Sequence, residues 1–256
     1  MELTILGTGN VATVLGFWLK NNGHTITQVY GRSKEKVHQL ATLLNAYPVV
    51  DLTKLQNNPL AIIAVNDAVV GELAEKLTTK FQYLFHTAGA LSINCLANTA
   101  PYYGVLWPMQ SLIASQLHYK AIPIGIETNC EEATNMVMND LLRFTKEKYL
   151  LSAEKRKQLH VAAVMVNNFP NFWWQLAEEF CLNNQLPFKS LLPLIQESAE
   201  RLTTFSAANT QTGPAKRGDV ATIQTHVSLL SQSPEVKELY QLMSNAIMKK
   251  WLHENQ

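Results

Sequence analysis

The residues best suited to chemistry stand near the start of the chain, in the segment Gly7-Thr8-Gly9-Asn10-Val11-Ala12. This segment matches the pattern G-x-G-x-x-[GA], in which the first glycine permits a tight turn, the second lets the backbone approach a pyrophosphate, and the third small residue allows close helix packing. It lies between an apolar strand and an expected helix, whose N-terminus attracts phosphate. The pattern predicts dinucleotide binding; the alternative is an ordinary glycine turn.

The end of the second expected strand decides which dinucleotide fits. An acidic residue that holds the ribose 2′-hydroxyl of NAD is expected there, but the chain has Tyr30-Gly31-Arg32-Ser33-Lys34. Arg32 offers a bidentate contact to a 2′-phosphate, and Ser33 offers a hydroxyl at a helix N-terminus. We therefore expect NADP(H). In the alternative interpretation, Arg32 is a solvated surface residue and Ser33 only a helix cap.

Further candidates follow the later strands, because ligands of a doubly wound sheet bind outside the carboxyl ends of its strands. His86 has a side chain that titrates near neutrality, so it is a candidate for proton transfer, and the alternative is a structural histidine. Gln110 is a candidate for substrate binding. The remaining candidates, all for the cofactor, are Val65, Asn66, Asp67 and Thr87.

Polar residues in the second half of the chain are candidates for the opposite wall of a cleft between two domains. Asn167 is a catalytic candidate and Asn168 a substrate-binding one, although both also suit hydrogen bonds between helices. Arg217, on a loop rich in glycine and proline, is expected to bind a substrate anion. Asp219 is a further catalytic candidate, either paired with His226 or acting only as a helix cap.

Dense aromatic side chains characterise the same half of the chain. Phe169, Phe172, Trp173 and Trp174 exceed what a free surface usually carries, so we expect them in a core or a subunit interface. With Trp251 they predict a homodimer formed through the helical domain.

The order of elements predicts an α/β fold in which a doubly wound Rossmann sheet precedes an all-α domain. Strands are expected at 3–6, 25–30, 60–65, 83–85, 103–106, 121–126 and 148–151, with helices at 10–21, 33–44, 68–77 and 131–146 between them. From residue 153 strand signals stop, and one long helix to 184 is expected to kink or break at Pro170. We place the NADP-binding domain at 1–152 and a helical domain for substrate and dimerisation at 153–256.

Composition narrows the class of protein. The 256 residues carry a formal net charge of +1, with 47% hydrophobic and 16% charged residues, so neither nucleic acid nor an anionic membrane is an expected partner. The three cysteines have no metal-ligand spacing, and no metal is expected. Without a signal core or an apolar run of membrane length, the chain is expected to be cytoplasmic.

The N-terminal half resembles the NADP-binding domain of pyrroline-5-carboxylate reductases, prephenate dehydrogenases, β-hydroxyacid dehydrogenases and deazaflavin-dependent NADP reductases. Gly31-Arg32-Ser33 and the segment from Ala61 to Asp67 carry this resemblance. Over almost its full length the chain resembles a bacterial group of Rossmann-like proteins, described as NADP oxidoreductases, with a C-terminal helical domain of unknown function. That resemblance rests on His86-Thr87-Ala88-Gly89-Ala90, on Gly104 to Ser111 and on Thr212 to Asp219. It implies an NADP cofactor and a 6-phosphogluconate-dehydrogenase-like arrangement.

Two departures from the better-known relatives matter for the reaction. Asn167-Asn168 stand where β-hydroxyacid dehydrogenases have K-x-x-N-N, but Val164 occupies the place of the lysine acid/base. Trp107-Pro108-Met109 replaces the H-P-M of prephenate dehydrogenases. Neither set of catalytic residues is complete in this chain.

The leading hypothesis is an NADP-dependent oxidoreductase that acts on a small, anionic carbonyl, imine or alcohol. The alternative is a non-catalytic NADP(H)-binding sensor or regulatory protein, which the missing lysine and histidine favour. A third hypothesis is a deazaflavin-linked reductase. The fold cannot decide between them, because function depends on the site.

Overall fold

The computed structural model describes residues 1–119 and 121–253 and divides the chain into two compact units, Met1–Asn168 and Phe169–Gln256. The first unit contains one eight-stranded sheet of order β3-β2-β1-β4-β5-β6-β7-β8. Neighbouring strands are parallel from β3 to β6, β7 is antiparallel to β6, and β8 is parallel to β7. The strands span Glu2–Leu6 (β1), Thr25–Tyr30 (β2), Tyr47–Val49 (β3), Leu60–Ile63 (β4), Tyr83–His86 (β5), Tyr102–Pro108 (β6), Ile124–Thr128 (β7) and Lys148–Leu150 (β8).

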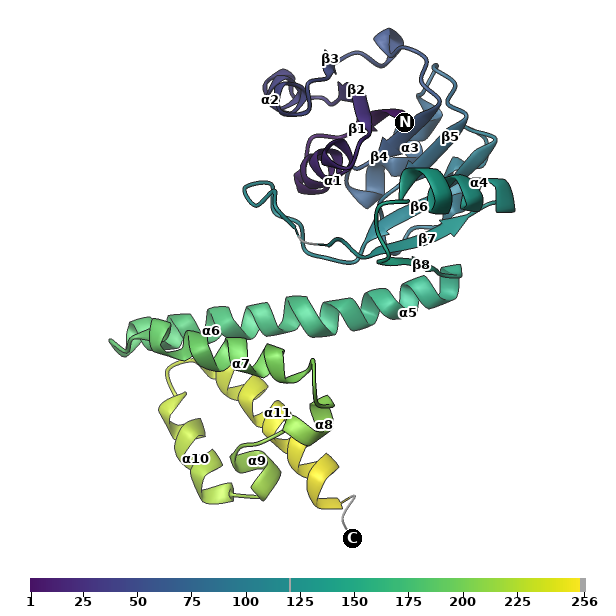
Figure 1. The fold of residues 1–256 in the computed structure, drawn as a ribbon. Coiled ribbons are helices and arrows are strands. Elements are labelled where there is room, and N and C mark those ends of the chain that lie inside the picture. The colour runs from purple at the N-terminus through teal and green to yellow at the C-terminus, as the bar shows by residue number, and fades with distance from the viewer. Residues whose placement is uncertain (120, 254–256) are drawn as a thin grey trace. The chain divides into compact units, whose positions relative to one another are not determined.

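Helices cover both faces of this sheet, as expected for a doubly wound fold (Figure 1). One core joins Leu3 and Ile5 to the apolar sides of α1, α2 and α4, and the other joins Leu6 and Ile63 to α3. Alternate residues of β1 therefore enter opposite cores, as the period of a strand requires. These helices are α1 (Asn10–Asn21), α2 (Lys34–Leu44), α3 (Val70–Glu75) and α4 (Glu131–Met136), the last followed by a π-helical turn at Val137–Leu141.

The sheet confirms the predicted fold class and shows where a ligand would bind. The chain leaves β1 toward β2 and β3, then returns to the other side of β1 to form β4. This reversal between β1 and β4 creates a crevice at the carboxyl edge, which is the usual ligand position in open α/β sheets. The predicted segments correspond to strands and helices here, and β3 is an additional strand.

Helix α5 (Ala153–Ala163) joins the first unit, although the sequence places the domain boundary at residue 152. The reason lies in Arg156, whose buried guanidinium pairs with Glu127 of β7. A π-helical turn at Val164–Asn168 then closes the unit, directly before the helix that contains Pro170. Its wider turn provides room where the proline ring would clash with the carbonyl of Val166, so this turn takes the place of the predicted break.

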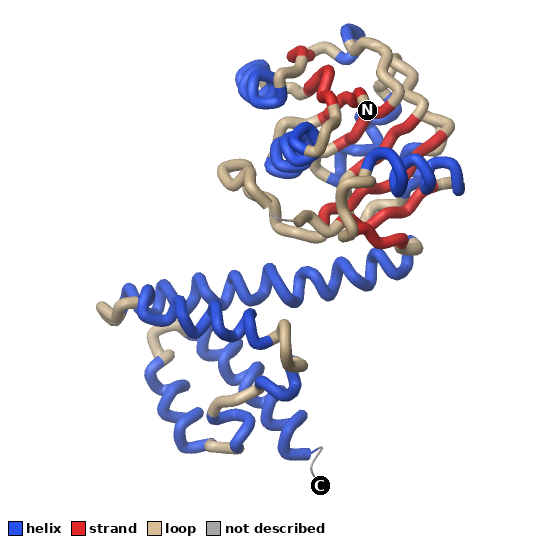
Figure 2. Tube along the Cα trace, in the orientation of Figure 1, coloured by secondary structure: helices blue, strands red, loops and turns tan. Residues whose placement is uncertain are grey.

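In the described part of the second unit, the regular elements are helices joined by loops (Figure 2). Its helices are α6 (Phe169–Asn183), α7 (Leu192–Arg201), α8 (Ala207–Thr210), α9 (Pro214–Arg217), α10 (Val220–Leu229) and α11 (Pro234–His253). Helix α7 ends at Arg201, and the segment rich in glycine and proline before Asp219, which was expected to be a loop, contains α9. Among the described residues, no helix is both long and apolar enough to cross a membrane.

Candidate functional site

The glycine turn after β1 adopts a conformation that only glycine accommodates at Gly7. Its φ of 139° lies in the region that disfavours side chains. A Cβ at this position would meet the carbonyl oxygen of Ala64 at 2.0 Å. The Gly7 amide donates to the carbonyl of Tyr30 at 2.8 Å and thereby joins the ends of β1 and β2. A glycine at position 7 is therefore required for the shape of the crevice.

Gly9 differs from Gly7 because it borders open space. A Cβ added at Gly9 would meet nothing within 4 Å, although the backbone has an ordinary φ of −85°. Gly9 is also the N-cap of α1, and no side chain caps that helix. The first amides of α1 therefore remain available for an anion, and the helix dipole adds positive potential there. Ala12, buried in the next turn, lets α1 pack closely on the sheet.

A groove of about 760 Å³ extends from this turn along the carboxyl edge. It contains eight of the predicted cofactor-binding residues: Gly7, Thr8, Gly9, Asn10, Val11, Arg32, Val65 and Asn66. Tyr30 and Leu52 form part of the same lining. The sequence motifs around the first, second and fourth strands thus converge on one groove, as their placement on parallel strands predicts.

The β2 end of the groove has positive charge on its surface. Arg32 is exposed and lines the groove, and Ser33 caps α2, where its Oγ accepts the Lys36 amide at 3.4 Å. Across the groove, Glu72 of α3 forms an ion pair with Lys76 at 2.5 Å. Lys76, and more weakly Arg32, hold the pKa of the Glu72 carboxyl below its usual range. Sequence reasoning missed Glu72 and Lys76 because α3 carries no recognisable motif.

The other predicted cofactor residues lie beside the groove and are not part of its lining. Ala12 is buried, and Ser33 acts as the cap of α2. Asp67 is exposed at the start of a 3₁₀ turn at Asp67–Val69, which Asn66 caps. The Thr87 hydroxyl donates to the Ile63 carbonyl at 3.5 Å, so this side chain links β5 to β4.

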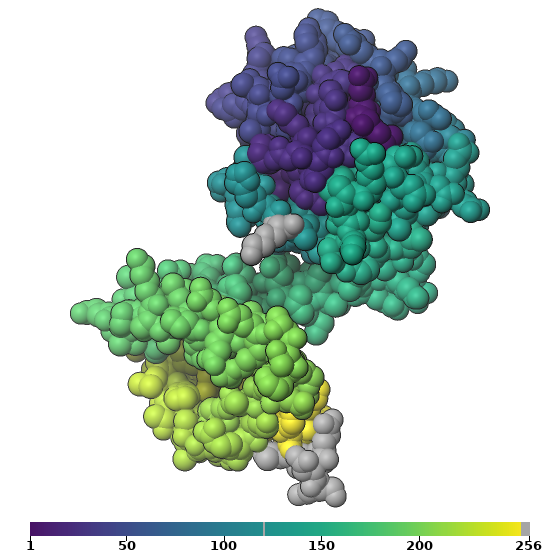
Figure 3. Space-filling model, in the orientation of Figure 1, coloured from purple at the N-terminus to yellow at the C-terminus, as the bar shows by residue number. Residues whose placement is uncertain are grey.

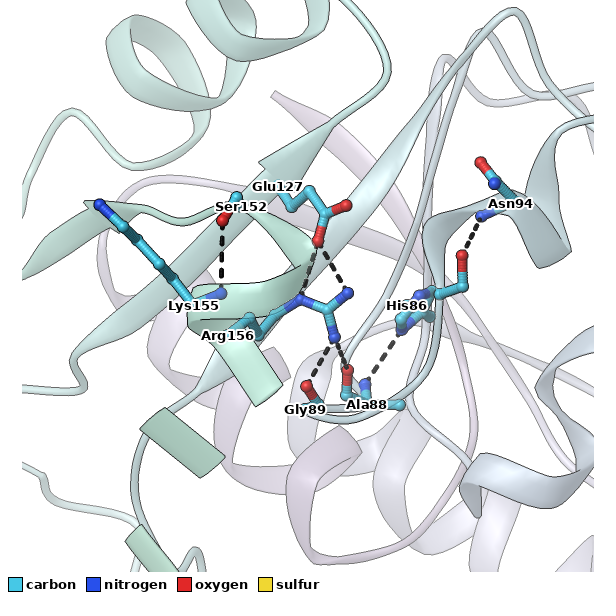
Figure 4. Close-up of polar contacts among 9 residues, drawn as sticks. His86, Ala88, Gly89, Asn94, Glu127, Ser152, Lys155 and Arg156 are labelled. Carbon is cyan, nitrogen blue, oxygen red and sulfur yellow. Dashed lines mark hydrogen bonds and ion pairs between the residues drawn. The ribbon is translucent and has the colours of Figure 1, made fainter. Parts of the chain in front are cut away.

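His86 has no exposed surface, and its Nδ1 accepts the Ala88 amide at 3.1 Å (Figure 4). Burial and then the charge of Arg156 lower the pKa of His86 to about 4, with a smaller opposing effect from the Ser92 carbonyl. A neutral, buried imidazole with one nitrogen occupied suits a structural role better than proton exchange with a ligand. The geometry therefore favours the structural alternative for His86.

Arg156 is the buried charge that organises this edge of the sheet. Its Nε and Nη2 donate to one carboxylate oxygen of Glu127 at 3.0 and 2.7 Å. Its Nη1 donates to the carbonyls of Gly89 at 2.6 Å and Ala88 at 3.4 Å, so the guanidinium lies between β7 and the turn after β5 (Figure 4). The regular spacing of residues on one face of α5 is the sequence signal that could have identified Arg156.

That face includes Arg156, His160, Ala163 and Asn167, which follow one another at intervals of four, three and four residues. His160 lies edge-on to the Trp107 indole, with 5.5 Å between ring centroids. Ala163 packs on the cluster that contains Trp107. In the π-helical turn, the Asn167 amide donates to Ser111 Oγ at 2.6 Å. π-Helical turns often occur at functional sites, and this one directs Asn167 toward the loop after β6.

The loop after β6 connects this helix face to the dinucleotide turn. The Ala114 amide donates to Asn10 Oδ1 at 3.1 Å, while Ser111 accepts from Asn167. Figures 1 and 3 show this teal loop beside the purple helix α1. Gln110, near the start of the loop, is exposed, and Asn168 is exposed in the π-helical turn. Asn10 and Asn167, two predicted site residues, thus contact the same loop.

The remaining candidates lie in the second unit. Asp219 caps α10: its carboxylate accepts the Thr222 amide at 3.1 Å and the Thr222 hydroxyl at 2.7 Å. These bonds lower the pKa of Asp219 and favour the capping alternative. His226 Nδ1 contacts Tyr240 Oη at 2.7 Å, in an apolar pocket of about 510 Å³ lined by Trp173 and Phe180. Arg217 is exposed at the end of α9.

Comparison with known proteins agrees with this geometry. Residues 122–247 match the model of a domain of unknown function, DUF2520. The chain is 33% identical to a "putative NADP oxidoreductase" of Bacteroides fragilis, over 97% of this chain and 98% of that one, with a TM-score of 0.90. A search of the curated proteins finds no significant match.

More distant solved structures share the fold. A reductive aminase of Aspergillus terreus, in complex with NADPH and ethyl levulinate, is 14% identical with a TM-score of 0.69, over 98% of this chain and 94% of that one. A 1-pyrroline-5-carboxylate reductase of Streptococcus pyogenes is also 14% identical, with a TM-score of 0.60, over 97% of this chain and 98% of that one. At this identity the likeness concerns the fold alone.

Proposed function

The chain belongs to the same family as the Bacteroides fragilis protein, Rossmann-like chains with a helical C-terminal domain, and we propose that it is an NADP(H)-dependent oxidoreductase. The observation that carries the proposal is the groove: an open glycine at an uncapped helix N-terminus, with Arg32 at its β2 end. The names of the family member and of the NADPH-bound reductive aminase support it.

The residues of the groove fit such a cofactor. The amides at the start of α1 would bind the pyrophosphate, and the empty space above Gly9 admits its close approach. Arg32 would bind the 2′-phosphate, and the Ser33 helix terminus adds a second anion-binding group nearby. Glu72 is already paired with Lys76, which reduces its repulsion of that phosphate. The cofactor, when bound, supplies or accepts a hydride.

The residues of the chain would position the substrate. The turn after β5 is held rigidly by Arg156, so its backbone offers a fixed surface at the carboxyl edge. Gln110 and Asn168, both exposed, remain the proposed substrate contacts of the first unit, with Asn167 beside them. Arg217 of the second unit remains the proposed contact for a substrate anion. The proposed substrate is a small carbonyl, imine or alcohol.

A non-catalytic NADP(H)-binding regulator is the second candidate, and one observation favours it. Val164 stands in place of the lysine acid/base of the β-hydroxyacid dehydrogenases, and His86 at the end of β5 is buried with a pKa lowered to about 4. Such a protein would bind the cofactor in the same groove without turning over any substrate.

A metabolite screen separates the two functions. The loss of NADPH absorbance is followed with small aldehydes, ketones and ketone–amine pairs, while thermal shift reports binding of each compound. We expect at least one compound both to stabilise the NADPH complex and to be reduced. Stabilisation by NADPH without turnover of any carbonyl or imine would favour the regulator.

A further inference from the structure

His160 is the side chain on the inner face of α5 with a buried nitrogen that is unpaired among the described residues. Arg156, one turn earlier, is saturated by Glu127 and the Ala88–Gly89 turn, and Asn167 donates to Ser111. The Nδ1 atom of His160 is buried and has no hydrogen-bond partner among the residues that the structure describes. Such buried, unsatisfied groups are rare in native proteins and often mark functional positions.

The surroundings of His160 fix the orientation of its ring. A Cβ added at Gly89 would lie 2.9 Å from His160 Nδ1 and 2.8 Å from Trp107 Nε1, so the glycine allows both rings to pack on this turn. Trp107 is buried and meets the imidazole edge-on. The Nδ1 side therefore faces the turn after β5, while the ring as a whole is only half-buried.

This orientation determines which nitrogen can reach a ligand. Nδ1 is buried without a partner among the described residues in either tautomer, as an unpaired donor or as an unpaired acceptor. Nε2 lies on the side of the ring away from Gly89 and is a hydrogen-bond donor whenever the neutral ring carries its proton there. His160 can therefore present its Nε2 to a ligand at the carboxyl edge of the sheet. His86 Nε2 is also buried without a hydrogen-bond partner among the described residues, but that side chain has no exposed surface from which to reach a ligand.

The position of His160 relative to the groove indicates which part of a bound dinucleotide lies near it. With Arg32 at the β2 side and the pyrophosphate at α1, a bound dinucleotide would continue across β4 toward β5, because the sheet order is β2-β1-β4-β5. The turn at Gly89 directly follows β5. The nicotinamide half therefore ends on the side of the groove where His160 lies.

We propose that His160 contacts the reacting end of the substrate, where its Nε2–H donates to a carbonyl oxygen or an imine nitrogen beside the nicotinamide. This inference rests on the proposed function. It assigns the polar contact to α5, one turn before Val164, the position at which the chain lacks the lysine of its relatives.

Carbethoxylation of histidines by diethyl pyrocarbonate, read by peptide mass spectrometry, tests the location. NADPH at ten times its Kd should slow modification of His160 about tenfold, because about one-tenth of the sites stay free. The adenosine fragment 2′,5′-ADP, which lacks the nicotinamide half, should leave His160 reactive, and the exposed His118 is the internal reference. Equal reactivity of His160 with and without NADPH, while calorimetry shows NADPH bound, would overturn the inference, as would equal protection by 2′,5′-ADP.

Two variants test the donor itself. The amide nitrogen of glutamine can take the place of Nε2, and that of asparagine the place of Nδ1. With a substrate from the screen, kcat/KM should fall about tenfold or more in His160→Asn but clearly less in His160→Gln, the loss expected for one hydrogen bond. Equal activity of both variants and the original chain would contradict the assignment. If calorimetry shows no NADPH binding at all, the proposed function itself fails, a result distinct from both outcomes above.

Discussion

Gly7 and Gly9 are the same residue type but have different roles in the dinucleotide turn. At Gly7 a Cβ would meet the Ala64 carbonyl at 2.0 Å on a backbone with positive φ, whereas at Gly9 it would point into open space. The first glycine is therefore required for folding, and the second for the approach of a ligand. Sequence pattern alone gives both residues equal weight.

Alanine substitutions should separate these tasks. Gly9→Ala should cost only about 1 kcal/mol of stability, the difference between the two residues as helix caps. Its NADPH affinity should fall about tenfold or more, as expected when a charge-assisted hydrogen bond is lost. Gly7→Ala should destabilise the fold by more than about 3 kcal/mol. Urea unfolding and calorimetry measure both quantities, and unchanged NADPH affinity in Gly9→Ala would contradict this division.

His86 should make stability depend on pH. Its pKa of about 4 in the folded chain lies below the unfolded value of 6.5, so the unfolded chain binds more protons between these values. The stabilisation is complete above pH 6.5 and is lost as the pH falls toward 4, by at most about 3 kcal/mol. His24, also buried with a lowered pKa, contributes in the same direction.

The contribution of His86 is isolated by comparison with His86→Asn, whose amide oxygen can still accept the Ala88 amide. The free energy of unfolding should fall less steeply in the variant between pH 6.5 and pH 4. Identical slopes in both proteins would show that His86 titrates normally.

At the scale of elements, the ion pair of Arg156 joins α5 to the sheet. Removing one partner of a buried pair leaves the other uncompensated, so Arg156→Ala should cost about 3–5 kcal/mol. The neighbouring Lys155 is exposed, and Lys155→Ala should change stability by no more than about 0.5 kcal/mol. Hydrogen exchange at Gly89 and Ala90 should quicken in the arginine variant alone. Similar stability of the two variants would show that the pair does not anchor α5.

The elements were largely predictable because their local signals agree with the fold. The apolar strand at 60–63 and the helix that begins at Asn10 follow from hydrophobic period and glycine placement. The position of α5 was not predictable, because an arginine in such a polar helix is expected to be exposed to solvent, whereas Arg156 is buried. His160 was missed for the same reason: its importance depends on Gly89 and Trp107, which lie far away in the sequence.

At the scale of the molecule, the second unit has little core of its own. In its described part, the buried apolar side chains are Cys181, Ala215, Ile223 and Leu230. Large apolar side chains are exposed instead, among them Phe172, Trp174, Leu194, Phe205 and Leu229. A helical unit of this size with so few buried residues needs further burial to be stable. We propose that a second copy of the chain covers this surface.

Light scattering at micromolar concentration should then give twice the mass of one chain. Leu229 lines the apolar pocket of this unit and is 64% exposed, so Leu229→Glu should weaken the dimer and lower Tm. Gln224→Glu, on the same helix, introduces the same charge at a polar position and serves as the control. A monomer of the original chain at that concentration would contradict the proposal.

The most direct test of the central claim is calorimetry of NADPH and NADH with the original chain, Arg32→Ala and Lys34→Ala. If the groove is an NADP(H) site, the original chain should prefer NADPH about ten- to a hundred-fold, the value of one charge-assisted contact to the 2′-phosphate. Arg32→Ala should lose most of this preference while NADH affinity stays nearly unchanged. Lys34→Ala, an exposed neighbour outside the groove lining, should largely keep it. Equal affinities of the original chain for both dinucleotides, or an undiminished preference in Arg32→Ala, would contradict the account.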